Sequence, residues 1–114
     1  MAPKITLIRA TGTWVVRAGG AVLGESKNAL ELSEGDHPPV IYFPRSDIAT
    51  AFLDSSPHTS HCPHKGAASY YSIVTKSKTI ENAVWSYETP LASLSKLKDH
   101  LAFYTSEDVA VERV

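Results

Sequence analysis

The sequence has little of what would place it in several large protein classes. It has one cysteine in 114 residues, so no intrachain disulfide can form, and this favours a reducing, cytoplasmic compartment. The net charge is −1, from 11 basic and 12 acidic residues, which disfavours nucleic acid polymers and anionic membranes as partners. No apolar run approaches the ~20 residues of a membrane span, and the first residues lack the apolar stretch of a signal peptide. We therefore expect one soluble domain over residues 1–114, as a monomer or a homodimer.

The apolar pattern predicts an α+β domain that is mainly β. Gly19-Gly20 lies between two apolar runs and predicts a tight hairpin, because both turn positions need a positive φ. Ser46 and Thr89-Pro90 are typical helix starts, and apolar residues at helical spacing follow each of them. They predict two short helices, at about 46–54 and 90–100, with His100 at the end of the second. A mostly antiparallel sheet of about six or seven short strands is expected from residues 5–9, 14–17, 21–23, 29–32, 40–43, 68–76 and 79–87.

The segment richest in reactive side chains is residues 55–66, SSPHTSHCPHKG. It contains three of the five histidines, the only cysteine and Lys65. No acidic residue occurs between Ser55 and Ile80, so this part of a nearly neutral chain is basic, which suits a small anion. We expect the segment to form a polar, partly exposed loop.

Metal binding is one hypothesis for this loop. Imidazole and thiolate are ligands for zinc and copper, and the loop offers four of them, His58, His61, Cys62 and His64. Their spacing is unfavourable, because His61 and Cys62 are adjacent and two prolines oppose a helical ligand face. The stretch from Cys62 to Gly66 matches half of a Rieske motif, whose other half needs a second cysteine. We expect no cofactor and no metal, with a metal site using residues 58–64 as an alternative.

Two other hypotheses use the same region. Cys62 could act as a nucleophile, with His64 or Lys65 favouring the thiolate, or it could pack as a small buried side chain. Alternatively, aromatic and cationic side chains could form a binding pocket, with Arg45 as an anion clamp and Trp85 and Tyr87 on one face of a strand. Aromatic residues at strand spacing could equally belong to the core.

Four blocks of the sequence carry a family resemblance. They are HPPVIYFPR from residue 37, CPHKGAASYY from residue 62, ENAVWSYETP from residue 81 and HLAFY from residue 100. In this order they resemble the family called domain of unknown function 427, over essentially the whole chain. The resemblance implies a compact, mostly β domain of the Mss4-like or β-tent group. It implies that any function is carried by the motif residues Tyr42, Arg45, Cys62, His64, Lys65, Tyr70, Trp85 and Tyr87.

The resemblance does not supply a reaction. Some members carry a nucleotidyltransferase label, but the chain has no Asp-x-Asp or Asp-x-Glu pair to hold magnesium. The leading hypothesis is a domain that binds a small anionic or nucleotide-like molecule near the CPHKG loop, through Tyr42, Arg45, His64, Tyr70, Trp85 and Tyr87. Cys62 and Lys65 are the candidates for a catalytic role, and the pattern leaves catalysis and simple binding both open. The alternative is a protein-interaction or structural module in which the aromatic residues are core.

Overall fold

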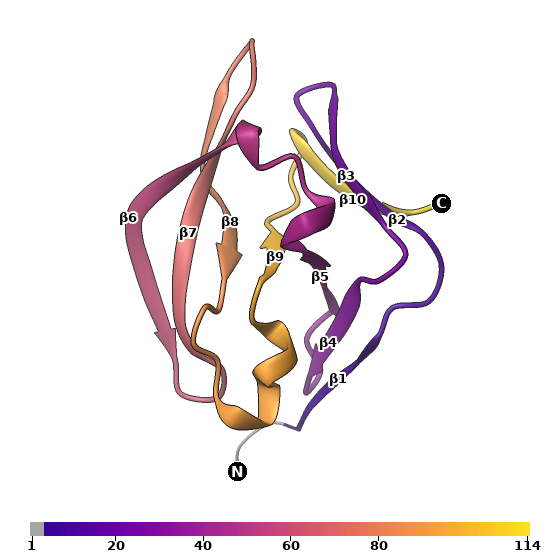
Figure 1. Cartoon of the computed structure of the whole chain (residues 1–114), viewed down its shortest axis with the longest axis vertical. Coiled ribbons are helices and arrows are strands. Elements are labelled where there is room, and N and C mark those ends of the chain that lie inside the picture. The colour runs from indigo at the N-terminus through magenta and orange to yellow at the C-terminus, as the bar shows by residue number, and fades with distance from the viewer. Residues whose placement is uncertain (1–3) are drawn as a thin grey trace.

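Two antiparallel sheets account for most of the chain. The computed structural model describes residues 4–114, which contain ten strands and three short 3₁₀ segments, η1 to η3 (Figure 1). The strands are β1 (Ile5–Arg9), β2 (Trp14–Ala18), β3 (Ala21–Ser26), β4 (Leu30–Glu34), β5 (Val40–Pro44), β6 (Leu53–Cys62), β7 (Gly66–Val74), β8 (Thr79–Ser86), β9 (His100–Phe103) and β10 (Val109–Arg113). The prediction of a mainly β, antiparallel architecture is thus confirmed, although the strands are more numerous than expected.

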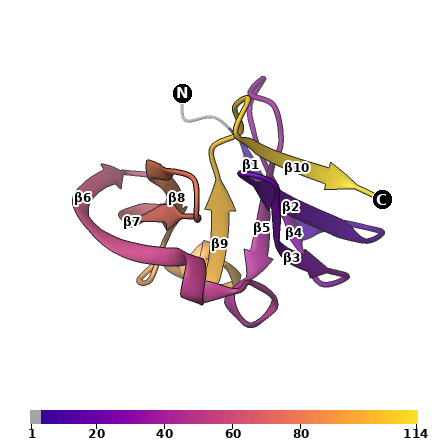
Figure 2. The same ribbon diagram turned by 90° about the horizontal axis from the view of Figure 1, so that it is seen from above.

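The larger sheet has seven strands in the order β1-β4-β5-β9-β8-β7-β6, and the smaller has the order β10-β2-β3. From above, β6, β7 and β8 lie to one side of β9, whereas β1, β4, β5 and the smaller sheet lie to the other (Figure 2). The hairpins of neighbouring strands are β2–β3, β4–β5, β6–β7 and β7–β8. The Gly19-Gly20 turn between β2 and β3 is as predicted, with φ values of 54° and 84°.

Alternating side chains give the seven-stranded sheet two apolar clusters. The first cluster holds Phe43, Val84 and Phe103 together with buried residues of the smaller sheet such as Val16. The second holds their strand neighbours, including Tyr42 and Ala102, with Tyr70, Tyr87, Leu94 and Leu97. Because successive residues of a strand point to opposite faces, adjacent residues of β5, β8 and β9 divide between the two clusters.

The predicted helix at 46–54 is wrong. The chain forms two 3₁₀ turns, η1 (Arg45–Asp47) and η2 (Thr50–Phe52), and β6 begins at Leu53. Ile48, between the turns, is extended and forms an isolated bridge with Gly24 of β3. This tertiary pairing uses backbone groups that a helix would need, and a β-branched residue suits it.

The predicted helix at 90–100 is replaced by η3 (Ala92–Leu97), a 3₁₀ segment with a non-helical residue at Leu94. Leu94 and Leu97 are both buried, and a spacing of three is the repeat of a 3₁₀ turn. Asp99 has a positive φ of 63° and redirects the chain, so that His100 starts β9 rather than ending a helix.

The predicted loop at 55–66 is also corrected, because residues up to Cys62 belong to the long strand β6. This strand lies at one edge of the seven-stranded sheet, where a proline can be accommodated. The register shifts between Ser56 and Thr59, around Pro57. Only residues 63–65 form a turn. Lys65, at the end of this turn, pairs with Glu34 at the end of β4.

Candidate functional site

The centre of the candidate site is a contact between Tyr42 of β5 and Trp85 of β8. The indole Nε1–H of Trp85 donates a hydrogen bond to the Tyr42 hydroxyl at 3.2 Å, and the rings meet edge to face with centroids 6.2 Å apart. Strand β9 lies between their strands, and there Ala102 pairs with Trp85. The small, fully buried Ala102 leaves room for the two large side chains to meet across it.

These two residues line a pocket of about 160 Å³, which we call the aromatic pocket. Three more tyrosines and one ion pair surround it. Lys65 Nζ lies 2.5 Å from Glu34 Oε1, and both side chains are largely shielded from solvent, with 13% and 19% exposed. The lining residues are Leu32, Glu34, His37, Pro38, Val40, Tyr42, Lys65, Tyr70, Trp85, Tyr87 and Tyr104.

The turn after β6 positions Lys65. Its amide donates to the Cys62 carbonyl oxygen at 3.1 Å, and its carbonyl accepts from the Leu91 amide at 3.1 Å. Gly66 follows with a φ of 120°, and a Cβ at this position would lie 3.1 Å from the carbonyl oxygen of Thr89. A glycine therefore suits this position, both for its backbone conformation and for the close approach of the segment after β8.

The Lys65–Glu34 pair holds both groups in their charged forms. The hydrogen bond from Lys65 lowers the pKa of Glu34 below its usual value, and burial opposes this only in part. Burial works to lower the pKa of Lys65, but the hydrogen bond with Glu34 and the proximity of Cys62 raise it overall. The pocket thus presents an ammonium donor and a carboxylate acceptor side by side.

The tyrosines of the pocket are neutral hydroxyls. Burial raises the pKa values of Tyr42 and Tyr87 well above the usual range. Burial, together with a hydrogen bond to Tyr70, raises the pKa of Tyr104 to about 12. Tyr70 OH also lies 2.9 Å from Ser60 Oγ of the edge strand β6. At neutral pH Tyr42, Tyr87 and Tyr104 can therefore each donate a hydrogen bond as well as accept one.

A wider pocket of about 750 Å³ adjoins the aromatic pocket and shares six lining residues with it: Glu34, His37, Pro38, Val40, Trp85 and Tyr104. The Trp85 and Tyr104 rings contact each other with centroids 4.4 Å apart, and half of Tyr104 is exposed. The remaining wall is largely apolar, with Trp14, Pro39, Ile41, Phe103 and Val111 beside Glu31 and Thr105. The aromatic pocket therefore provides a small space with polar groups, and the wider pocket beside it provides a broad aromatic surface.

Five of the eight residues singled out from the sequence line the aromatic pocket: Tyr42, Lys65, Tyr70, Trp85 and Tyr87. Cys62 does not line it; its half-buried side chain packs against the second cluster, close enough to raise the pKa values of Lys65 and Tyr87. His64 lies in the same turn, and its charge contributes to the lowered pKa of Glu34.

Arg45 does not line the aromatic pocket. Its guanidinium donates a hydrogen bond to Glu88 and lies over the Tyr71 ring, 5.5 Å from the centroid. Tyr70 and Tyr71 are consecutive in β7 and point to opposite faces, the first towards the aromatic pocket and the second towards Arg45. The sequence hypothesis placed Arg45 and Lys65 in one pocket, whereas in the structure they lie in different places.

Sequence reasoning missed six residues of the aromatic pocket. Leu32, Pro38 and Val40 are apolar wall residues, Glu34 and His37 were assigned no role, and Tyr104 ends a recognised block without having been assigned a role. The usable signal was the aromatic run Phe103-Tyr104, in which alternation places Tyr104 on the opposite face from the buried Phe103. Nothing in the sequence indicates that Glu34 meets Lys65, because the contact joins the ends of two distant strands.

The histidine-rich segment does not assemble a ligand set. Across residues 4–114, no three His, Cys, Asp or Glu side chains lie close enough to hold one metal ion. The ring of His58 instead packs against Tyr70, with centroids 4.5 Å apart. Over the same residues, no helix is long and apolar enough to cross a membrane.

Comparison with known proteins agrees with the four sequence blocks. Residues 6–114 match the family model described as Domain of unknown function (DUF427). The chain belongs to this family. No curated protein sequence matches the chain. The match of this DUF427 chain runs from β1 to the C-terminal residue, so it includes every residue of the aromatic pocket.

Proposed function

We propose that this DUF427 domain binds a small anionic or nucleotide-like molecule in the aromatic pocket and the wider pocket beside it. The observation that carries the proposal is the convergence of Tyr42, Tyr70, Trp85 and Tyr87 around the Lys65–Glu34 pair. Binding sites commonly combine apolar and aromatic walls with a few polar groups that fix orientation.

The size of the two pockets suggests how such a ligand would divide between them. At about 160 Å³ the aromatic pocket holds a small polar group, whereas the adjoining 750 Å³ matches the usual volume of a small-molecule site. Trp85 and Tyr104 line both pockets and would stack on a planar ring.

The charged groups of the aromatic pocket, Lys65 and Glu34, favour a ligand whose ring carries polar groups at its edge. Lys65 has three donor hydrogens and Glu34 uses one of them, so the ammonium can still donate to an anionic or carbonyl oxygen. Glu34 can accept from an amine or imide N–H beside that oxygen. A nucleobase presents such neighbouring donors and acceptors on one edge, and His37 could add a further contact to a negative group.

Two finer properties belong to the same proposal. We propose that the fold is of the Mss4-like or β-tent group, supported by the antiparallel seven-stranded sheet with the smaller sheet against it. We also propose that the protein works in the cytoplasm, supported by its single free thiol.

The test is a thermal-shift screen of nucleotides, nucleosides and aromatic carboxylates, followed by calorimetry on any ligand that raises the melting temperature. We expect the substitution Lys65→Met to weaken binding by about tenfold or more, because a charged hydrogen bond is lost. Lys76→Met, in the exposed turn between β7 and β8, is the matched control and should leave the affinity unchanged.

Two results would count against small-molecule binding. One is equal weakening by both substitutions, which would indicate a general charge effect. The other is the absence of any stabilising ligand, combined with Tyr104→Ala abolishing capture of a protein partner. The second result would favour an interaction module.

A further inference from the structure

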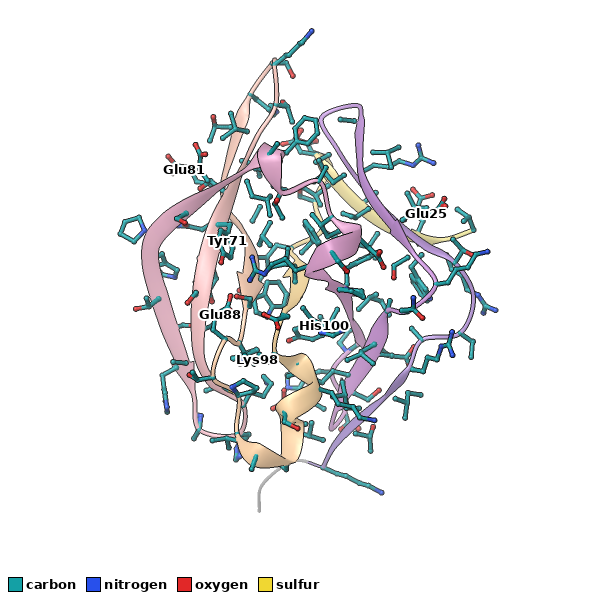
Figure 3. All side chains as sticks on the ribbon, in the orientation of Figure 1. Glu25, Tyr71, Glu81, Glu88, Lys98 and His100 are labelled. Carbon is teal, nitrogen blue, oxygen red and sulfur yellow. The ribbon has the colours of Figure 1, made fainter. Side chains whose placement is uncertain are left out.

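A third pocket lies apart from the aromatic pocket and the wider pocket, where β5 meets β9. It measures about 800 Å³, and we call it the basic pocket. Its lining residues are Pro44, Arg45, Ser46, Ile48, Thr50, Lys98, Asp99 and His100, none of which lines the aromatic pocket. In Figure 3, Lys98 and His100 lie in the same central region of the view as Tyr71 and Glu88, the residues that hold Arg45.

Strand pairing brings the two halves of this pocket together. Pro44 at the end of β5 pairs with His100 at the start of β9. The Arg45 amide then donates to the Asp99 carbonyl oxygen at 2.8 Å. Asp99 has a positive φ and lies between Lys98 and His100. The strand pairing thus places Lys98 and His100 beside Arg45, although they are distant from Arg45 in sequence.

Arg45 is oriented before any ligand arrives. Glu88 Oε1 accepts from the Arg45 guanidinium, from the Ser86 hydroxyl at 2.9 Å and from the Tyr71 hydroxyl at 3.4 Å. The guanidinium also lies over the Tyr71 ring. Only one Arg45 nitrogen is used by Glu88, and a guanidinium has five N–H donors, so several remain for a ligand.

The electrostatics of the lining favour an anion. Glu88 offsets the charge of Arg45, so Lys98 and His100 must supply the remaining attraction. Lys98 has no carboxylate within ion-pair distance in the described part of the chain, and Asp99 is the one acidic residue of the lining there. His100 Nδ1 lies 3.0 Å from the Lys98 carbonyl oxygen; donation from Nδ1 leaves Nε2 of the neutral ring as an acceptor for a P–OH group.

We propose that the basic pocket binds the phosphate group of a small phosphorylated molecule. Arg45 and Lys98 bring guanidinium and ammonium donors from two segments, and the hydroxyl-bearing residues Ser46 and Thr50 also line the pocket. A phosphate group carries more negative charge and more acceptor oxygens than a carboxylate, so it can use more of these donors at once. The pocket volume leaves space for a small organic group beside the phosphate.

The test is titration of the ¹⁵N-labelled protein with inorganic phosphate at constant ionic strength, followed by amide NMR shifts. We expect saturable shifts at residues 45–50 and 98–100, and weaker shifts with acetate. Lys98→Gln should weaken phosphate binding by about fivefold or more. Lys96→Gln is the matched control, because Lys96 is equally exposed on η3 but does not line the pocket, and it should leave the affinity unchanged.

Non-saturating shifts, or equal weakening by Lys96→Gln and Lys98→Gln, would overturn the proposal, and so would saturable shifts confined to the aromatic pocket. Both variants change exposed side chains, so their melting temperatures should match the wild type and loss of folding cannot mimic loss of binding. The shifts at residues 45–50 and 98–100 are distinct from shifts at the aromatic pocket, so failure of this proposal and failure of the proposed function are distinguishable.

Discussion

Replacing Lys65 with methionine removes the cation from the Lys65–Glu34 pair and keeps most of the side-chain volume. With 13% and 19% of the two side chains exposed, the pair lies between a surface ion pair and a fully buried one. Surface pairs contribute about 0–1 kcal/mol, whereas breaking a buried pair costs about 3–5 kcal/mol. We therefore expect Lys65→Met to lower the free energy of unfolding by about 2 kcal/mol at pH 7. Urea unfolding followed by circular dichroism measures this difference.

The loss should depend on pH in a defined direction. The pKa of Glu34 is lowered in the folded protein relative to its usual 4.5. Its pairing therefore stabilises the fold fully above about pH 5 and ceases to do so as the pH falls through the lowered pKa. In the Lys65→Met variant the Glu34 carboxylate has no partner, and its protonation removes the cost of burying a charge. The difference between variant and wild type should shrink steadily from pH 5 to pH 3.

Two controls isolate the pair. Lys76→Met removes an exposed charge and should change stability by less than about 0.5 kcal/mol. The double variant Lys65→Met with Glu34→Gln should recover part of the lost stability, because no unpaired carboxylate is left. A stability difference that stays constant from pH 7 to pH 3, or that equals the effect of Lys76→Met, would refute the reasoning.

Two further substitutions test how the site is built. Tyr42→Phe removes the acceptor of the Trp85 indole N–H and should lower the free energy of unfolding by about 1 kcal/mol, measured by urea unfolding; an unchanged midpoint would mean that water replaces the bond. Gly66→Ala should cost about 1–3 kcal/mol, because the φ of 120° is strained for alanine and the new methyl group approaches Thr89. Gly20→Ala shares the positive φ but meets nothing within 4 Å, so a thermal melt should show a smaller loss for it; equal losses would show that the contact with Thr89 is unimportant.

Local chemistry explains which parts of the fold could be predicted. The hairpin at Gly19-Gly20 follows from φ values that the two residues themselves favour. Strands β7 and β8 follow from their β-branched and aromatic residues. The helix predicted at 46–54 failed because Ile48 pairs with Gly24, a contact that no window of local sequence contains.

The candidate site also has parts that could be predicted from the sequence and parts that could not. Tyr42 and Trp85 could be singled out as motif aromatics, and they do meet in the structure. Their grouping with Arg45 could not be checked from sequence, because it depends on which face of the sheet each residue reaches. The partnership of Lys65 with Glu34 was equally out of reach, since it depends on β4 and the turn after β6 ending at the same place.

The pairing of β10 with β2 has a consequence for how the chain folds. Val109 lies opposite Ala18, so the smaller sheet joins segments from near the two ends of the chain. During synthesis the β2–β3 hairpin emerges before β10, so the smaller sheet stays incomplete until β10 pairs with β2. Contacts between such distant segments slow folding, because the intervening chain has to be ordered first. We infer that β10 completes the smaller sheet, and that shortening the chain before β10 would remove one of the three strands of that sheet together with the buried Val109.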